Sequence, residues 1–213
     1  MLKNLGTKRS YPIRATLIIM TCITLCSCHS IPKQIISANN YSQSLLENPE
    51  QTPTLSSEQP IKKYRIRPVN TFRLIARVLA KKRHYFDEWH TLLPIDLSLG
   101  WGKMADLDLI KSDDVQFWHE GRFNTWDAAS LNHFTEDEII RKSTNIHILP
   151  ANKSIKEYLF SAVQKGDLIY LEGDLVDVQD EKGVWTPTST RRDDTGAGAC
   201  EILLVRKVHH IDG

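Results

Sequence analysis

The sequence predicts an α+β fold that is mainly antiparallel sheet, with one main helix and strands that could close into a small OB-like barrel. Three observations support this fold class. Residues 64–86 alternate apolar and polar side chains with the period of a strand, whereas residues 154–167 have the apolar spacing of a helix. Residues 200–211 form a strand-like run that is apolar in its middle. We therefore expect residues 64–213 to form a single α+β globular domain.

The first half of this domain predicts three elements. Phe72, Leu74, Ala76 and Val78 occupy alternate positions, which predicts a long strand. The segment LLPIDLSLGWGKM (92–104) carries one proline and two glycines, and it predicts a turn and loop with a short helical piece. The segment VQFWHEGRFNTW (115–126) is aromatic, and it predicts a strand that leads to a turn at its glycine.

Two helical segments flank the next predicted strand. Thr135 and Glu138 have the spacing of a capping box, which predicts a capped helical turn. The segment NIHILPA (145–151) predicts a short strand that ends at its proline. The main helix is expected in SIKEYLFSAVQKGD (154–167), where Gly166 ends it.

The last quarter of the chain predicts three strands. The segment 167–190 predicts two of them, which the turn DEKG (180–183) connects. Gly173 interrupts the first of these strands at a place where a barrel would bend. The apolar middle of CEILLVRKVHHI (200–211) predicts a central strand.

The N-terminus has the composition of a secretory signal. The first 46 residues contain no Asp or Glu, and four Lys and Arg residues precede an uncharged run from Ala15 to Cys26. A basic region, a short apolar run and small residues are typical of an export signal. The run is too short to span a bilayer, because a spanning helix needs roughly 20 apolar residues.

The residues LCSC (25–28) resemble the bacterial lipobox, in which a leucine at −3 and a small residue at −1 precede an obligatory cysteine. Cys26, at −2, departs from that pattern. The resemblance implies that residues 1–27 are a lipoprotein signal peptide and that Cys28 carries S-diacylglycerol and N-palmitoyl groups. It further implies, through His29 at +2, retention at the outer membrane of a diderm bacterium. Simple signal cleavage and an uncleaved anchor are the alternatives.

Residues 28–63 are expected to be the acylated cysteine followed by a disordered linker. The segment is rich in Ser, Pro, Asn and Gln, and its one aromatic residue is Tyr41. A flexible chain of this length would reach roughly 30 Å. Removal of residues 1–27 takes away four basic residues and no acidic one, which leaves 23 basic against 26 acidic residues. A mildly acidic protein without a large basic patch does not predict a nucleic-acid partner.

From Leu93 onward the chain also resembles an uncharacterised family of bacterial proteins. The segments that carry the resemblance are DLSLGWGKM, NIHILPA, GDLIYLEGDLVDV and TRRDDTGAGACE. The resemblance implies a single domain and names no reaction.

One catalytic arrangement is compatible with these segments. Cys200 follows a Gly-Ala loop and could be a nucleophile if His147 served as its base and Asp193 oriented that base. Cys200 could equally be a small buried apolar residue where this loop enters a strand. No HExxH or CxxC spacing predicts a metal site, and no motif predicts a cofactor.

These observations favour a non-enzymatic envelope lipoprotein that presents a soluble binding or structural domain. Its contacts would be the membrane, through the lipid anchor, and a protein partner in the envelope. The alternative is a small cysteine hydrolase that uses Cys200 and His147. An open cleft that brings the two side chains within hydrogen-bond reach would favour the hydrolase.

Overall fold

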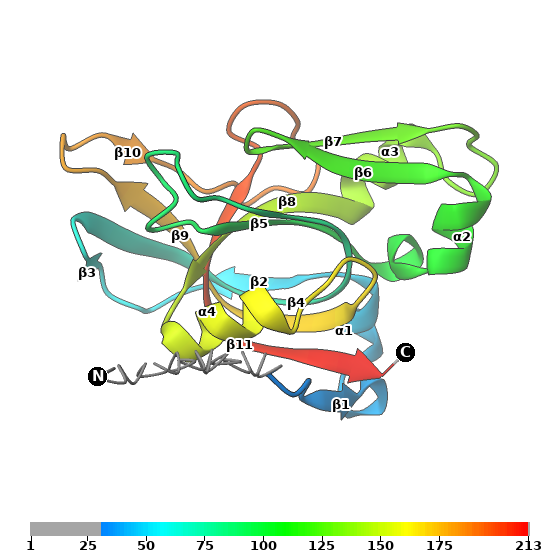
Figure 1. Ribbon diagram of the computed structural model, residues 1–213, viewed down its shortest axis with the longest axis horizontal. Coiled ribbons are helices and arrows are strands. Elements are labelled where there is room, and N and C mark those ends of the chain that lie inside the picture. The colour runs from blue at the N-terminus through cyan, green and yellow to red at the C-terminus, as the bar shows by residue number, and fades with distance from the viewer. Residues whose placement is uncertain (1–30, 213) are drawn as a thin grey trace, which may run out of the picture.

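The computed structural model describes residues 31–212, and its centre is a nine-stranded mixed sheet with four short α-helices around it (Figure 1). The predicted signal peptide and Cys28 lie outside the described residues. Seven of the nine strand pairings are antiparallel, so the expected α+β class with a mainly antiparallel sheet is confirmed.

Five strands pair in a ring, but they do not form the barrel that the sequence suggested. The ring runs through β4 (Tyr64–Arg83), β5 (Ile95–Gly100), β8 (Ser143–Pro150), β11 (Glu201–Asp212) and β9 (Leu168–Gln179), which pairs again with β4. β4 and β9 are much longer than β5 and β8, and they pair with each other over most of their length. Their far halves therefore leave the ring and extend the sheet towards β3 (Gln59–Ile61) and β10 (Trp185–Thr186).

The core lies between the ring strands and α4 (Lys153–Ser161), the predicted main helix. Leu159 and Val163 are fully buried against apolar residues of β4, β5, β8 and β9. The burial of β4 alternates, as its sequence predicts, in residues 64–67 and 72–74, whereas residues 74–80 are all buried except Arg77. α4 ends at Ser161, with Ala162 as its C-cap, so the prediction that Gly166 ends this helix was wrong; Gly166 lies in the following turn with a φ of +91°.

The segment 92–104 differs from its prediction as a turn and loop. It contains β5, in which all six residues are buried, followed by a 3₁₀ turn at Gly102–Ala105. The loop prediction was wrong because the proline and glycines that suggested it flank or end the strand, and the strand itself is covered on both faces.

A small outer layer covers one face of β5 and β8. It consists of α2 (Leu107–Ser112), the hairpin of β6 (Val115–Glu120) and β7 (Phe123–Ala128), and α3 (Glu136–Lys142). The expected hairpin turn at Gly121 and the capping box of Thr135 and Glu138 are both present. This layer covers the polar side chains of β5 and β8 that belong to the candidate site.

The expectation of a disordered linker does not hold for residues 31–63. β1 (Ile35–Ser37) pairs with β11, while β2 (Glu50–Pro53) and β3 pair with β4. A 3₁₀ turn at Ala38–Asn40 and α1 (Gln43–Glu47) connect these strands, and Tyr41 stacks on Tyr170 with ring centroids 5.0 Å apart. Pairing at a sheet edge uses backbone groups, so a polar segment can become ordered with few apolar side chains.

Candidate active site

The antiparallel register of β5 and β8 gathers four polar side chains on one face of the sheet. Asp96 lies opposite His147, and Ser98 lies opposite Asn145. Side chains alternate along a strand, so these four lie on the face opposite the apolar core residues of the same strands. The β6–β7 hairpin covers them and adds further polar groups. A polar layer therefore lies between the sheet and the hairpin.

Asp96 is the centre of this layer. Its carboxylate is fully buried and accepts hydrogen bonds from His147 Nδ1 at 2.9 Å, His84 Nε2 at 2.8 Å and Arg122 Nη1 at 3.1 Å. A buried carboxylate is strongly destabilising unless such partners surround it. Asp96 thereby fixes the ring of His147 through one nitrogen.

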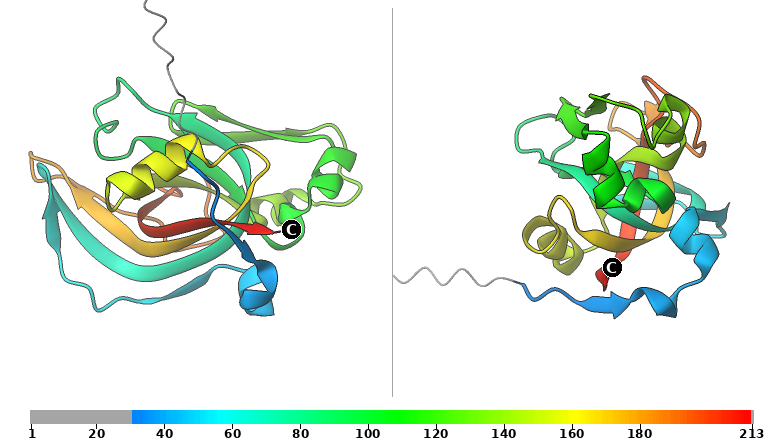
Figure 2. Two further views of the ribbon diagram at one scale, coloured as in Figure 1. Left: turned by 60° about the horizontal axis from the view of Figure 1, so that its bottom comes forward. Right: turned by 90° about the vertical axis from the view of Figure 1, so that its right-hand side faces the viewer.

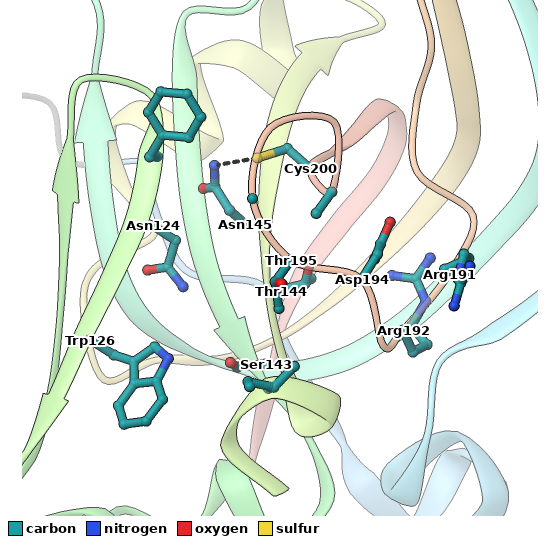
Figure 3. A pocket seen from close by; sticks show the side chains of 14 residues that line it. Asn124, Trp126, Ser143, Thr144, Asn145, Arg191, Arg192, Asp194, Thr195 and Cys200 are labelled. Carbon is teal, nitrogen blue, oxygen red and sulfur yellow. Dashed lines mark hydrogen bonds between the residues drawn. The ribbon is translucent and has the colours of Figure 1, made fainter. Parts of the chain in front are cut away.

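The parallel pairing of β11 with β8 brings Cys200 to this layer. Glu201 pairs with Ile146 and Ile202 with His147, so Cys200 enters the sheet beside Asn145. The Asn145 Nδ2 atom lies 3.4 Å from the Cys200 Sγ atom (Figure 3). Cys200 is half-buried and has no disulfide partner among residues 31–212.

His147 is hydrogen-bonded to Asp96 and is close enough to Cys200 for that group to affect its pKa. Burial by itself lowers the pKa of His147, but hydrogen bonds to Asp96 and to Cys200, together with the charges of these groups, raise it to about 9. The imidazole is therefore protonated at neutral pH.

Cys200 also lines a cavity of about 220 Å³. Trp126 of β7 lies on one side, and the loop that carries Arg191, Arg192 and Asp194 lies on the other (Figure 3). Phe123 of β7 also lines the cavity. The cavity therefore has an apolar side and a polar side. Its volume suits one small substituent of a larger molecule.

Asn145 is held in one orientation by two neighbours. Its Nδ2 donates to the Arg122 carbonyl at 2.8 Å, and its Oδ1 lies 3.1 Å from His119 Nε2. Burial lowers the pKa of His119, so this ring favours its neutral form. The amide that approaches Cys200 is thus fixed before any ligand binds.

The structure corrects the role predicted for Asp193. This residue is exposed, and its carboxylate accepts from Arg191 Nε at 2.9 Å. A second contact, of 3.7 Å, joins it to Arg141. It lies on the surface of the loop, away from the polar layer, and Asp96 takes the place beside His147. The pairing of β11 with β8 brings Cys200 near His147, and the catalytic role of the two residues stays a prediction.

Sequence reasoning missed Asp96, Asn145 and Arg122. The signal for Asp96 was present in PIDLSLG, where Asp96 and Ser98 alternate with three apolar residues. Read as a buried strand instead of a loop, this segment would have predicted a buried carboxylate in need of partners. Asn145 and His147 have the same spacing on β8.

Comparison of the chain with models of protein families, with curated proteins and with solved structures found no match at all. The resemblances to a lipobox and to an uncharacterised bacterial family therefore stay predictions. Within residues 31–212, no group of His, Cys, Asp and Glu side chains has the arrangement of a metal site. None of the helices in this part of the chain is long and apolar enough to cross a membrane.

Glu201, the neighbour of Cys200, makes the folding stability depend on pH. Its carboxyl is buried with Arg192 and Thr144, and burial raises its pKa from 4.5 to about 7, although both neighbours lower it. An acid with a raised pKa binds its proton more tightly in the folded state. Its contribution therefore favours folding below pH 4.5 and is lost as the pH rises to about 7.

Between pH 4.5 and about 7, the ionisation of Glu201 should lower the free energy of unfolding by about 3 kcal/mol. We expect Glu201→Gln to remove this pH dependence. The measurement is urea unfolding at several pH values, with the exposed Glu136→Gln as the matched control. His147 loses its own contribution only above pH 6.5, so lower pH values isolate Glu201. Parallel pH profiles for wild type and Glu201→Gln would contradict the raised pKa.

Proposed function

We propose that the domain is a small cysteine hydrolase that acts on acyl compounds, with Cys200 as its nucleophile. The observation that carries the proposal is the position of His147, which is hydrogen-bonded to Asp96 and lies on the strand that pairs with the residues following Cys200, close enough for Cys200 to raise its pKa. This order of nucleophile, base and orienting carboxylate is the arrangement that acyl transfer by a thiol needs. The sequence alone favoured a non-enzymatic domain, and this geometry favours its alternative.

The proposed reaction follows from these contacts. The Cys200 thiolate attacks the carbonyl carbon of an ester or amide, and the protonated His147 gives its proton to the leaving group. This leaves a thioester on Cys200. Water then attacks the thioester, His147 takes the proton of that water, and the acid is released as the thiol is restored. Asn145 Nδ2, 3.4 Å from Sγ, is close enough to donate to the oxygen that becomes negative.

We further propose that the hydrolase is a lipid-anchored protein of the bacterial envelope. The support is the basic, then apolar, N-terminal sequence and the lipobox-like residues that end at Cys28. One acyl chain anchors a protein only marginally, at about 0.8 kcal/mol for each buried CH₂, whereas three chains hold it permanently. The intact mass of the protein from a membrane fraction tests this directly. We expect residues 28–213 plus three acyl chains and glycerol, and an unmodified full-length mass would reject the anchor.

The catalytic proposal is tested by acyl transfer to Cys200. Incubation with p-nitrophenyl acetate should add one acetyl group to Cys200, located by peptide mass spectrometry, and His147→Ala should slow this addition by about 10²-fold or more. The control is His133→Ala, because His133 also contacts a buried aspartate, Asp113, but lies away from Cys200. If His147→Ala and His133→Ala were acetylated at the same rate, the hydrolase proposal would fail and the binding domain would be favoured.

A further inference from the structure

The solvent side of α4 and the adjoining end of β4 form a basic surface, which we call the α4 face. Glu157 lies on α4 itself, and Asp167, which pairs with Lys33 and His210, borders the face. Its five cations are Lys82, Arg83, Lys153, Lys156 and Lys165.

Most of these cations have no carboxylate partner within residues 31–212. Lys153 lies 3.5 Å from Glu157, and the other four form no ion pair there. Arg83 and Lys156 instead lie over the ring of Phe160, at 4.9 and 5.5 Å from its centroid. The α4 face is therefore positively charged on a protein whose expected mature form is acidic overall.

Lys81 lies half-buried beside this surface. It donates to three carbonyl groups at the C-terminal end of α4, and burial, followed by the charge of Arg83, lowers its pKa to about 8, although Asp167 raises it. A hollow of about 570 Å³ beside it is lined by Lys82, Lys165 and Trp118 and by no carboxylate. An anionic group placed here would relieve the repulsion.

The first described residues of the chain lie next to α4. Lys33 Nζ lies 2.7 Å from Asp167, and the Gln34 amide donates to the Tyr158 hydroxyl of α4 at 3.0 Å. Five peptide bonds connect Cys28 to Lys33, and an extended chain of that length spans at most about 18 Å. The expected long tether is therefore replaced by a short one, because residues after 34 are bound to the sheet.

We propose that the α4 face docks on the anionic phospholipid headgroups of the membrane that holds Cys28. The inference rests on the lipid anchor of the proposed function, which would place the bilayer surface within about 18 Å of α4. Each lysine or arginine near an anionic surface strengthens the attraction about fivefold. In this orientation the Cys200 cavity opens away from the membrane, since its loop and β7 lie on the side of the molecule opposite α4 and β1 (Figures 1 and 2).

The test is a lysine-labelling footprint of the membrane-extracted full chain, reconstituted in two kinds of vesicle. One kind contains phosphatidylcholine alone, and the other also contains phosphatidylglycerol. We expect Lys156 and Lys165 to be acetylated about fivefold more slowly on the anionic vesicles, and the difference to vanish at high salt. Lys111 in α2 and Lys182 in the β9–β10 turn should be labelled equally on both.

Charge reversal provides the matched comparison. The double variant Lys82→Glu, Arg83→Glu should lose the protection of Lys156 and Lys165, whereas Lys111→Glu, Lys182→Glu should keep it. Equal labelling of Lys156 and Lys165 on both kinds of vesicle would overturn the docking proposal. The intact mass of the same sample reports separately whether Cys28 is acylated, so a failed footprint and a failed anchor are distinguishable.

Discussion

Replacing Asp96 with asparagine is expected to slow the acylation of Cys200 by a factor on the order of 10³. The carboxylate holds His147 in its protonated form, and it raises the pKa of that ring to about 9 together with Cys200. An asparagine has no charge to stabilise the protonated form of His147. Its amide can also donate to Nδ1 of His147, which favours the tautomer that has its proton on the other nitrogen. The measurement is the acetylation rate of Cys200 as a function of pH.

The pH profile separates this role from a general loss of stability. In wild type we expect acylation to decline above about pH 9, where His147 loses its proton, and in Asp96→Asn we expect that decline to begin at a lower pH. The control is Asp113→Asn, which alters another fully buried aspartate with a histidine partner. Identical pH profiles for Asp96→Asn and wild type would show that Asp96 does not act through His147.

Gly173→Ala is expected to destabilise the fold by at least about 3 kcal/mol. A Cβ atom at this position would lie 2.0 Å from the Leu204 carbonyl oxygen and 2.9 Å from its carbon. These are backbone atoms of β11, so no side chain can rotate away to make room. The two strands of the ring would have to separate where they pair. Urea unfolding measures the loss.

Gly121→Ala is the matched control for this prediction. Gly121 has a φ of +61°, but no atom lies within 4 Å of the place where its Cβ would be. Alanine at this position would therefore cost only the strain of a side chain at positive φ, about 1 kcal/mol of stability. If both variants lost the same stability, the close approach of β11 to Gly173 would not be the cause.

The elements that the sequence predicted are those with a local signal. β4 alternates in its own sequence, α4 has its apolar face, and the Thr135 capping box needs only residues three apart. Each of these patterns is complete within one segment. They can therefore be recognised without knowing which other segments they contact.

The elements that were missed depend on distant partners. β5 is buried on both faces, so the alternation that marks a half-exposed strand was hidden. β1, β2 and β3 are strands because β4 and β11 offer them an edge, which no local pattern reports. The carboxylate partner of His147 was misassigned for the same reason. Asp193 is near Cys200 in sequence, whereas Asp96 reaches His147 only through the register of two strands.

Because β11 closes the ring of strands, the order of folding and export is constrained. The last twelve strand residues pair with β8 and β9 and also receive β1, so β11 joins parts of the chain that are far apart in sequence. Folds built from such distant pairings form slowly, and this one cannot be completed until residues 201–212 are available. A nascent chain that is exported, as we propose, would therefore stay unfolded while its N-terminus engages the secretion machinery, and the site around Cys200 would assemble only after translocation.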